Sequence, residues 1–378
     1  MTAAADGFAE LAGELSTAFG EGFGEPWVET RFDDWARRVF AFQFEANPVY
    51  RRFCLARGRR PATVSHWHEV PLVPTSAFKH LELATGPAEA TFQTSGTTGG
   101  VGRRGRHGVR SLALYRSSAL PALRAHLLPE GGRIQILSLV PSITDAPESS
   151  LAWMLHFAVD DFGAPDSDTF VSPKTGVDTA AFAAALDHAV SGQLPVWVAG
   201  TAFAFVHWMD AVRSGHVRAV RLPPGSRIME TGGFKGRSRE VARDDLYREL
   251  GRVFDVPRAW IVNEYGMTEL CSQFYDTVAG LDPERSLSAR RHRPPPWMRT
   301  RVLHPETLDP LPPGERGVLA HYDLANLGSV SAVLTEDLGV ADADGRFRLS
   351  GRSPGAEPRG CSLALEDLLR VHRGGDGT

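Results

Sequence analysis

Apolar residues recur every three or four positions between residues 7 and 60, which is the spacing of one face of a helix. The recurring positions are Phe8, Leu11, Leu15, Phe19, Trp35, Val39, Phe42 and Phe44. The pattern ends where Asn47 and Pro48 interrupt it. We therefore expect a helical N-terminal lobe, which we place in residues 1–90.

Beyond this lobe, short β-rich runs alternate with runs of helical spacing. The expected strands are residues 134–140, 195–199, 227–230 and 259–263, and the expected helices are residues 180–190, 202–213 and 239–250. Such alternation is typical of an α/β unit with layered, largely parallel sheets. We place this core in residues 91–280.

The composition changes after Leu281, where an Arg/Pro-rich stretch begins. Short strand-like runs separated by Pro and Gly turns follow at residues 297–303, 317–324, 331–335 and 346–349. They predict a small antiparallel β subdomain in residues 281–350. The last segment, residues 351–378, is a short tail too small for a core of its own.

The charge balance excludes some functions. Lys and Arg number 41 and Asp and Glu 45, which gives a net charge of −4 and no general positive field for nucleic acid or an anionic membrane. No apolar stretch reaches the roughly 20 residues of a membrane span, and Met1–Gly20 lacks the basic start of a secretion signal. We expect a cytoplasmic protein.

Cysteine and lysine are both rare. Cys54, Cys271 and Cys361 lie far apart without CxxC spacing, which indicates free thiols and not a disulfide framework or zinc site. The lysines are Lys79, Lys174 and Lys235, so no lysine follows position 235.

The strongest local motif is TSGTTGG at residues 94–100. Glycines allow an anion to approach the backbone closely, and the hydroxyl groups add donors beside the main-chain N–H groups, so the motif suits a polyphosphate. It lacks the Gly-Lys-Ser/Thr ending of a Walker A loop. The alternative is a solvated turn.

Two further motifs follow expected strands. NEYGMTE at residues 263–269 offers Glu269 as an oxygen ligand for Mg²⁺ and Thr268 as a phosphate donor. ETGGFK at residues 230–235 offers paired glycines against which a flat base can lie. Plain strand-end turns are the alternative for both.

The last motif is TEDLG at residues 335–339, followed by GRFRLSGR at residues 345–352. An aspartate that closes a strand can accept both hydroxyls of a ribose, and arginine is a planar donor. Asp344-Gly345 predicts the turn of a β-hairpin.

These motifs, in this order, resemble those of the adenylate-forming ligases, the superfamily of acyl-CoA synthetases and luciferases. VPTSAFK at 73–79, ESSLAWM at 148–154 and RGCSL at 359–363 resemble more closely the acyl-protein synthetases, the long-chain-fatty-acid luciferin-component ligases. The resemblance implies the large-domain fold of those ligases, with the usual C-terminal domain truncated.

The resemblance also implies a role for each motif residue. Thr94, Ser95, Gly96, Thr97, Thr98 and Gly99 would hold the ATP phosphates, although the usual closing lysine is absent. Gly232 and Gly233 would flank the adenine, Tyr265 with Gly266 would form its stacking side, and Asp337 and Arg352 would hold the ribose. Thr268 would contact the α-phosphate and Glu269 would bind Mg²⁺.

Two tasks need other residues. The family's C-terminal catalytic lysine has no counterpart here, so Lys235 or Lys79 is a candidate cation; the alternative for each is a surface charge. Cys361 matches the cysteine that receives the acyl group as a thioester in the acyl-protein synthetases, and its alternative is a small residue packed under a C-terminal helix.

Residues near the expected strand ends are candidates for the acid pocket. They are Ser149, Ser150, Trp153 and Met154, with Phe203, Phe205, His207 and Trp208 on the next helix. An aromatic stripe at this spacing is otherwise a core feature.

The function expected from the sequence is ATP- and Mg²⁺-dependent formation of an acyl-adenylate from a carboxylic acid of the fatty class, with release of pyrophosphate. Acyl transfer to Cys361 and then to an acceptor protein, a reductase or carrier, would follow. A ligase that uses CoA or a carrier thiol directly is one alternative. A catalytically inactive scaffold, or a P-loop kinase that releases ADP, is another.

Overall fold

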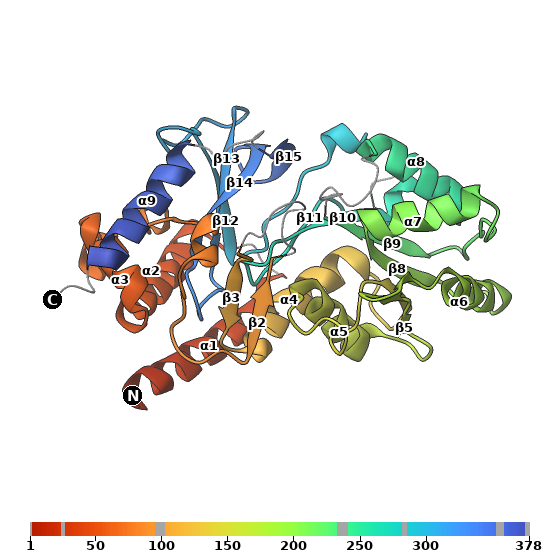
Figure 1. The fold of residues 1–378 in the computed structure, drawn as a ribbon, viewed down its shortest axis with the longest axis horizontal. Helices are drawn as coiled ribbons and strands as arrows, with labels where there is room; N and C mark the ends of the chain where they lie inside the picture. Colours follow the sequence, from red (N-terminus) through yellow and green to blue (C-terminus); the bar gives the residue numbers. More distant parts are fainter. Residues whose placement is uncertain are drawn as a thin grey trace.

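The structure is a computed structural model of the 378-residue chain. It describes residues 2–23, 27–94, 103–232, 241–281, 286–352 and 359–374. Figure 1 shows two groups of elements joined side by side, with the N-terminus and C-terminus both beside the group that contains β12 to β15.

The N-terminal region is helical, as the apolar spacing predicts. Helices α1 (Thr2–Gly22), α2 (Glu29–Ala46) and α3 (Pro48–Ala56) follow one another. The predicted break at Asn47-Pro48 is a helix cap: the Asn47 side chain accepts a hydrogen bond from the Tyr50 N–H, and Pro48 starts α3. The domain boundary at residue 90 stays a prediction.

The larger sheet is built from strands that are buried on both faces, except for the two-residue edge strand β5. Among the described residues its order is β11-β10-β9-β8-β4-β5, and every pair is parallel except β10 with β11. The strands are β4 (Gln135–Leu139), β5 (Asp168–Thr169), β8 (Val196–Thr201), β9 (Arg227–Thr231), β10 (Ile261–Tyr265) and β11 (Phe274–Tyr275). The predicted parallel α/β core is confirmed.

Helices cover both faces of this sheet (Figure 1). Alternate strand residues explain the layers: Met229 packs on the side of α4 (Leu112–Leu127) and α5 (Ser150–Phe162), whereas Ile228 packs on the other side. That other side is covered by α6 (Thr179–Ser191), α7 (Ala202–Arg213) and α8 (Arg243–Phe254).

Two predicted elements are displaced along the chain. The helix expected at residues 239–250 runs to Phe254 as α8, where Asp255 caps it with a left-handed φ of 51°. The strand expected at 259–263 begins at Ile261, because Pro257 leads into a short 3-10 turn at Arg258–Trp260. The true carboxyl end of β10 is therefore Tyr265.

The second sheet is the predicted antiparallel β subdomain, with one addition. Strands β12 (Met298–Leu303), β13 (Arg316–Asp323), β14 (Ala332–Ala341) and β15 (Phe347–Arg352) pair antiparallel in chain order. Strand β1 (Val73–Pro74), from the N-terminal region, adds to β14 in parallel. The predicted hairpin turn lies between β14 and β15, where the Gly345 N–H donates to Asp342 O at 3.1 Å.

Three smaller pieces complete the fold. Strands β2 (Ala90–Gln93) and β3 (Arg106–Val109) form a hairpin, as do β6 (Val171–Ser172) and β7 (Gly176–Val177). Helix α9 (Arg359–Gly374) lies beside α3 in Figure 1, and Arg57 pairs with Asp367 at 3.1 Å between them. The tail of the chain therefore docks on its beginning.

None of the helices in the described residues is long and apolar enough to cross a bilayer.

Candidate active site

Three of the predicted residues meet through hydrogen bonds at the place where the two sheets adjoin. The Tyr265 hydroxyl donates to Asp337 Oδ2 at 2.8 Å, and Arg352 Nε donates to Asp337 Oδ1 at 2.7 Å. Tyr265 and Asp337 are buried, whereas the Arg352 side chain is 61% exposed. The carboxylate of Asp337 thus holds one residue from the larger sheet and one from the β subdomain.

The electrostatics of this group follow from burial and charge. Burial, followed by the nearby Asp337 carboxylate, raises the pKa of Tyr265 well above its usual value, so the phenol is a neutral donor. The same carboxylate raises the pKa of Arg352, which stays cationic. A ribose hydroxyl reaching Asp337 would find an acceptor already oriented by two donors.

The position of Asp337 corrects one expectation. The sequence pattern predicts that Asp337 ends a strand, but β14 continues to Ala341. The pairing of β14 with β15 shifts register between Asp337 and Gly339, and such irregularities re-aim a side chain without ending a strand. Gly339 suits this crowded place, since a Cβ there would come within 2.8 Å of Leu319 Cδ2.

Of the first motif the structure describes Thr94, which pairs with Gly105 beyond the motif. Thr94 and Gly105 exchange hydrogen bonds: the Thr94 N–H donates to Gly105 O at 3.0 Å, and the Gly105 N–H donates to Thr94 Oγ1 at 2.9 Å. A Cβ at Gly105 would stand 3.0 Å from Thr94 Cγ2 and 3.7 Å from Glu269 Oε1. The loop that begins at Thr94 therefore starts next to Glu269.

The Thr268–Glu269 turn is held by residues that the sequence reasoning did not identify. His107 Nδ1 donates to Thr268 O at 2.7 Å, and its Nε2 lies 2.9 Å from Asn326 Oδ1. Asn326 Nδ2 in turn donates to Glu269 O at 2.8 Å. His107 and Asn326 stand in no motif and far apart in the sequence, so no local signal points to them.

The two groups belong to one region. Glu269 follows Tyr265 by four residues, both side chains are buried, and the Glu269 carboxylate is among the charges that raise the pKa of Tyr265. The junction of the sheets therefore brings together six of the predicted residues: Thr94, Thr268, Glu269, Tyr265, Asp337 and Arg352.

The paired-glycine motif and the residues near it are partly described. Gly232 follows β9 with a φ of 74°, which favours glycine. A Cβ at Gly266 would come within 2.5 Å of Glu264 Oε1, so a larger residue there would displace the Glu264 carboxylate. Glu264, which the sequence reasoning gave no role, is buried and accepts a hydrogen bond from the Thr231 hydroxyl.

Several predicted site residues lie outside the described residues. They are Ser95, Gly96, Thr97, Thr98 and Gly99 of the first motif, with Gly233 and the candidate cation Lys235. The other candidate cation, Lys79, ends a short 3-10 turn on the exposed surface. All of these assignments stay predictions.

The ring of Tyr265 is enclosed by other rings. Those of Phe274, His292, His321 and Phe347 have centroids 5.6 to 5.8 Å from it. Because these rings cover most of the Tyr265 ring, adenine could stack only on the part that they leave open. This stacking stays a prediction.

The aromatic stripe on α7 is core, the alternative that its spacing left open. Phe205 and Trp208 are fully buried, and Trp208 packs against Phe182 at 4.7 Å between ring centroids. Phe203 is partly exposed and His207 exposed. Of the candidates near α5, Ser149 caps the helix by accepting from the Ala152 N–H, and Met154 is buried.

Cys361 lies on the other side of β14. It lies in the first turn of α9 and is 1% exposed. Its Sγ donates a hydrogen bond to Thr335 O at 3.4 Å. It packs with Leu303, Val318, Ala320, Leu334 and Leu338. Because side chains alternate along a strand, Val333 faces the core that contains Tyr265 while Leu334 faces Cys361.

The other cysteines are packing residues, as expected. Cys54 and Cys271 are buried and free. Burial raises the pKa of Cys54 to about 12 and that of Cys271 well above its usual value, so neither is a thiolate near neutral pH.

Known structures share this fold. An open conformation of 2-hydroxyisobutyryl-CoA ligase, in complex with 2-HIB-AMP and CoA, matches with a TM-score of 0.64 and 16% identity over 86% of this chain and 69% of that one. The postadenylation state of the same ligase matches with a TM-score of 0.65. The chain therefore has the fold of an adenylate-forming ligase.

The family follows from the sequence match. Residues 32–370 match the family model described as acyl-protein synthetase, LuxE. The long-chain-fatty-acid–luciferin-component ligase of Aliivibrio fischeri is 22% identical over 360 residues, covering 89% of this chain and 88% of that relative. The corresponding ligase of Vibrio harveyi is 20% identical over 359 residues, with the same coverage.

The chain belongs to the acyl-protein synthetase LuxE family. It is an ATP-dependent, AMP-forming ligase that activates a carboxylic acid as an acyl-adenylate and transfers the acyl group. The expectation of an inactive scaffold is thereby set aside.

Proposed function

We propose that this protein adenylates a fatty acid at the junction of its two sheets, transfers the acyl group to Cys361, and then passes it to an acceptor protein. The observation that carries the proposal is the joining of Tyr265, Asp337 and Arg352 by hydrogen bonds of 2.8 and 2.7 Å beside Glu269. The fatty class of the acid rests on the two relatives, which are named as long-chain-fatty-acid ligases.

Adenylation brings two anions together, because the acid's carboxylate attacks the α-phosphorus of ATP and pyrophosphate leaves. The protein's part is to align the groups and neutralise charge. Asp337 would accept the ribose hydroxyls, Arg352 would supply positive charge next to them, and the segment that starts at Thr94 would bind the β- and γ-phosphates. Thr268 would donate to the α-phosphate.

The donor set near Thr94 fits a magnesium ion. Mg²⁺ in nucleotide sites takes one or two carboxylates and otherwise phosphate and water oxygens. Glu269 offers one buried carboxylate, and the space over Gly105 that a Cβ would fill lies 3.7 Å from its Oε1. When bound, the ion would neutralise charge on the phosphates. Glu269 would hold it.

The acyl transfer has a balanced form. The Cys361 sulfur attacks the carbonyl carbon of the acyl-adenylate, AMP leaves with the electron pair of the broken C–O bond, and the thiol proton is released. An acceptor would then take the acyl group from the thioester. Because Cys361 is buried under α9, this step requires α9 to move away from β14.

That burial also favours a second candidate function. A ligase that passes the adenylate directly to CoA or to a carrier thiol needs no exposure of Cys361. In that case Cys361 remains a packing residue of α9.

A labelling experiment decides between them. The protein is incubated with ATP, Mg²⁺ and radiolabelled tetradecanoate, and hydroxylamine-labile label on the chain is counted. We expect label on the wild type and on Cys54→Ala, and none on Cys361→Ser, while acid-dependent exchange of pyrophosphate into ATP persists in all three. Exchange without any label on the wild type would favour the direct ligase. Absence of exchange with a panel of fatty acids would contradict the proposed adenylation.

The compartment and partner complete the proposal. None of the three cysteines, all within the described part of the chain, forms a disulfide, which suits a reducing cytoplasm. The acceptor would be a protein such as a reductase or carrier, and the relatives' names refer to a luciferin component.

A further inference from the structure

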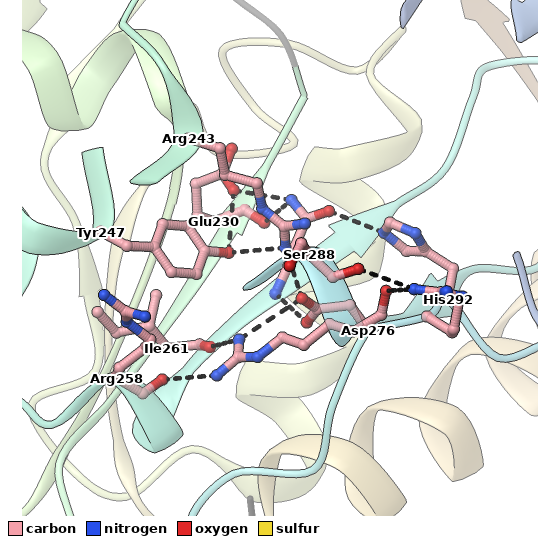
Figure 2. A network of polar contacts seen from close by, with 11 residues as sticks. Glu230, Arg243, Tyr247, Arg258, Ile261, Asp276, Ser288 and His292 are labelled. Atoms are coloured by element: carbon pink, nitrogen blue, oxygen red, sulfur yellow. Dashed lines mark hydrogen bonds and ion pairs between the residues drawn. The ribbon is translucent and has the colours of Figure 1, made fainter. Parts of the chain in front are cut away.

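Figure 2 shows a buried polar network, which meets the proposed nucleotide site where the His292 ring lies 5.7 Å from that of Tyr265. It joins Glu230 at the end of β9, Asn263 in β10 and His292 in the segment before β12. Asn263 Nδ2 donates to Glu230 Oε2 at 2.7 Å and to Glu230 O at 3.1 Å. On the other side of the same amide, Asn263 Oδ1 lies 2.8 Å from His292 Nε2. The amide therefore links an acid to an imidazole.

The network has a direction. Since the amide nitrogen of Asn263 faces the acceptors of Glu230, its oxygen must face His292, and His292 Nε2 must be the donor. His292 is 2% exposed, and burial lowers its pKa to about 4, so the ring is neutral at physiological pH. The hydrogen-bond pattern thus fixes one tautomer of His292, with its proton on Nε2.

His292 also contacts both halves of the proposed ribose site. Its ring stacks on that of Phe347 at 5.4 Å and meets that of Tyr265 at 5.7 Å. Its main chain forms a bridge with Phe347: the His292 N–H donates to Phe347 O at 2.7 Å, and the Phe347 N–H donates to His292 O at 3.1 Å. Phe347 begins β15, the strand that ends with Arg352 opposite Asp337.

The acid end of the network is anchored to the far layer of the sheet. Tyr247 of α8 donates its hydroxyl to Glu230 Oε2 at 3.4 Å, and Arg243 of α8 pairs with Asp276. Asp276 Oδ1 accepts from the Asn263 N–H at 2.8 Å. Arg290 Nη1 lies 3.5 Å from Asp276 Oδ2 (Figure 2). Arg243 and Tyr247 of α8, Asp276 and Arg290 are the titratable and charged groups around Glu230, and Tyr265 and His321 also face His292.

We propose that His292 is a positioning residue for nucleotide binding: held as the Nε2–H tautomer by Asn263 and Glu230, it sets the placement of Tyr265 and of β15 with Arg352. The inference rests on the proposed function, because it assumes that Tyr265, Asp337 and Arg352 bind the nucleotide. Among the described residues, His292 contacts the rings of Tyr265 and Phe347 and not the charged groups of Asp337 or Arg352, so its effect passes through these two rings and the β15 backbone.

The first test measures the Kd of ATP with Mg²⁺ by calorimetry, without any acid substrate. In His292→Phe the stacking surface remains and the donor is lost, leaving the Asn263 oxygen unpaired; we expect the Kd to rise about tenfold. In His292→Gln the new amide can donate from nearly the same place, so most of the affinity should return. The matched control is His126→Phe, another buried histidine that stacks on an aromatic ring, Tyr275, outside the network.

The second test exchanges the acid and the amide of the network between positions 230 and 263. Asn263→Asp alone puts two carboxylates face to face and should weaken ATP binding. Glu230→Gln combined with Asn263→Asp restores a donor toward position 263, while the new carboxylate still accepts from His292, so the double variant should recover to within about threefold of the wild type. Nitrogen NMR of the wild type should show the Nε2–H tautomer of His292 unchanged between pH 5 and 9.

The outcomes are separable. A wild type that binds no ATP overturns the proposed function and this inference with it. A wild type that binds ATP, with a folded His292→Phe variant within twofold of its Kd, overturns this inference alone. If His292→Phe does not fold, the variants at positions 230 and 263 decide. A double variant that binds ATP no more tightly than Asn263→Asp contradicts the proposal, and so does an Nδ1–H tautomer of His292 in the wild type.

Discussion

The two faces of β14 are chemically opposite. One face carries Asp337, whose carboxylate accepts hydrogen bonds from Tyr265 and Arg352. The other carries Leu334 and Leu338, which enclose Cys361 beneath α9. One strand therefore separates the proposed site of adenylate formation from the proposed acyl acceptor, although Thr335, which accepts from the thiol, is only two residues from Asp337.

This separation bears on how two reactions can share one small molecule. An adenylate is attacked by any thiol that reaches it, so a thiol kept in an apolar niche allows the first reaction to finish before the second begins. The polar face is held by charge and hydrogen bonds, and the apolar face by packing. The two faces should therefore respond to different mutations.

The polar face should be most sensitive to Asp337→Ala. The change removes an acceptor of two hydrogen bonds, one of them from a guanidinium, and bonds to charged groups contribute about 1.5 to 3 kcal/mol each. We expect acid-dependent pyrophosphate exchange to fall at least ~100-fold. The exchange assay with saturating fatty acid measures this.

Asp337→Asn is the matched control for charge. It keeps one acceptor of similar shape, so its exchange rate should lie between those of the wild type and Asp337→Ala. If Asp337→Ala keeps full exchange while its unfolding curve is unchanged, the polar face of β14 is not the nucleotide site.

The buried network behind the polar face, which includes Glu230 of β9, predicts a pH dependence of stability. Burial raises the pKa of Glu230 from 4.5 to about 7, so the folded state holds this proton more tightly than the unfolded state. The free energy of unfolding therefore falls as the pH rises from about 5 to 7, and the loss persists at higher pH. The shift corresponds to about 3 kcal/mol at most.

Glu230→Gln lacks this titration. Relative to the wild type, its free energy of unfolding should increase between pH 5 and pH 8, as measured by urea denaturation at both values. If the difference in free energy of unfolding between Glu230→Gln and the wild type is the same at pH 5 and pH 8, the assignment is contradicted.

The sequence predicts the two sheets and the nucleotide motifs, but it does not predict every pairing between strands. The parallel core and the antiparallel β subdomain follow from apolar periodicity, and the nucleotide motifs from residue types that suit phosphate and ribose. The addition of β1 to β14 does not follow, because a two-residue strand such as Val73–Pro74 has no periodicity to read.

The residues that brace the site are the part that sequence reasoning cannot reach. His107 holds Thr268 across a separation of 161 residues, and Asn326 holds Glu269 across 57 residues. His292 stands in an Arg/Pro-rich stretch that carries no periodic pattern. Their roles depend on tertiary contacts, and a single sequence gives no signal for such contacts.

The apolar face should respond to a change in packing at Gly360. A Cβ at this position would come within 2.7 Å of Leu308 Cδ2 and 2.9 Å of Pro305 O, so Gly360→Ala should push the start of α9 away from the β subdomain. Overpacking of this kind destabilises by about 1 to 3 kcal/mol. We expect Cys361 to react about tenfold faster with iodoacetamide.

Gly13→Ala is the control for this change. Gly13 also lies in a helix, on its exposed side, and a Cβ there would meet nothing within 4 Å. Peptide mapping identifies the alkylated cysteine. Equal labelling of Cys361 in both variants would mean that docking of α9 does not control access to the thiol.

The smallest effect on the apolar face should come from the ion pair that joins α9 to α3. Asp367 lies 3.1 Å from Arg57 Nη2, but its side chain is 48% exposed, and exposed ion pairs contribute about 0.2 to 1 kcal/mol. The Arg57 guanidinium also stacks over the Phe53 ring at 3.9 Å, a contact that Asp367→Asn leaves in place. We therefore expect Asp367→Asn to change Cys361 alkylation less than about twofold, and the difference to vanish in 1 M salt. Asp245→Asn, which breaks an exposed pair with Arg248 on α8, should leave the alkylation rate unchanged. A tenfold effect of Asp367→Asn would show that charge, and not the apolar packing around Cys361, holds α9 on the β subdomain.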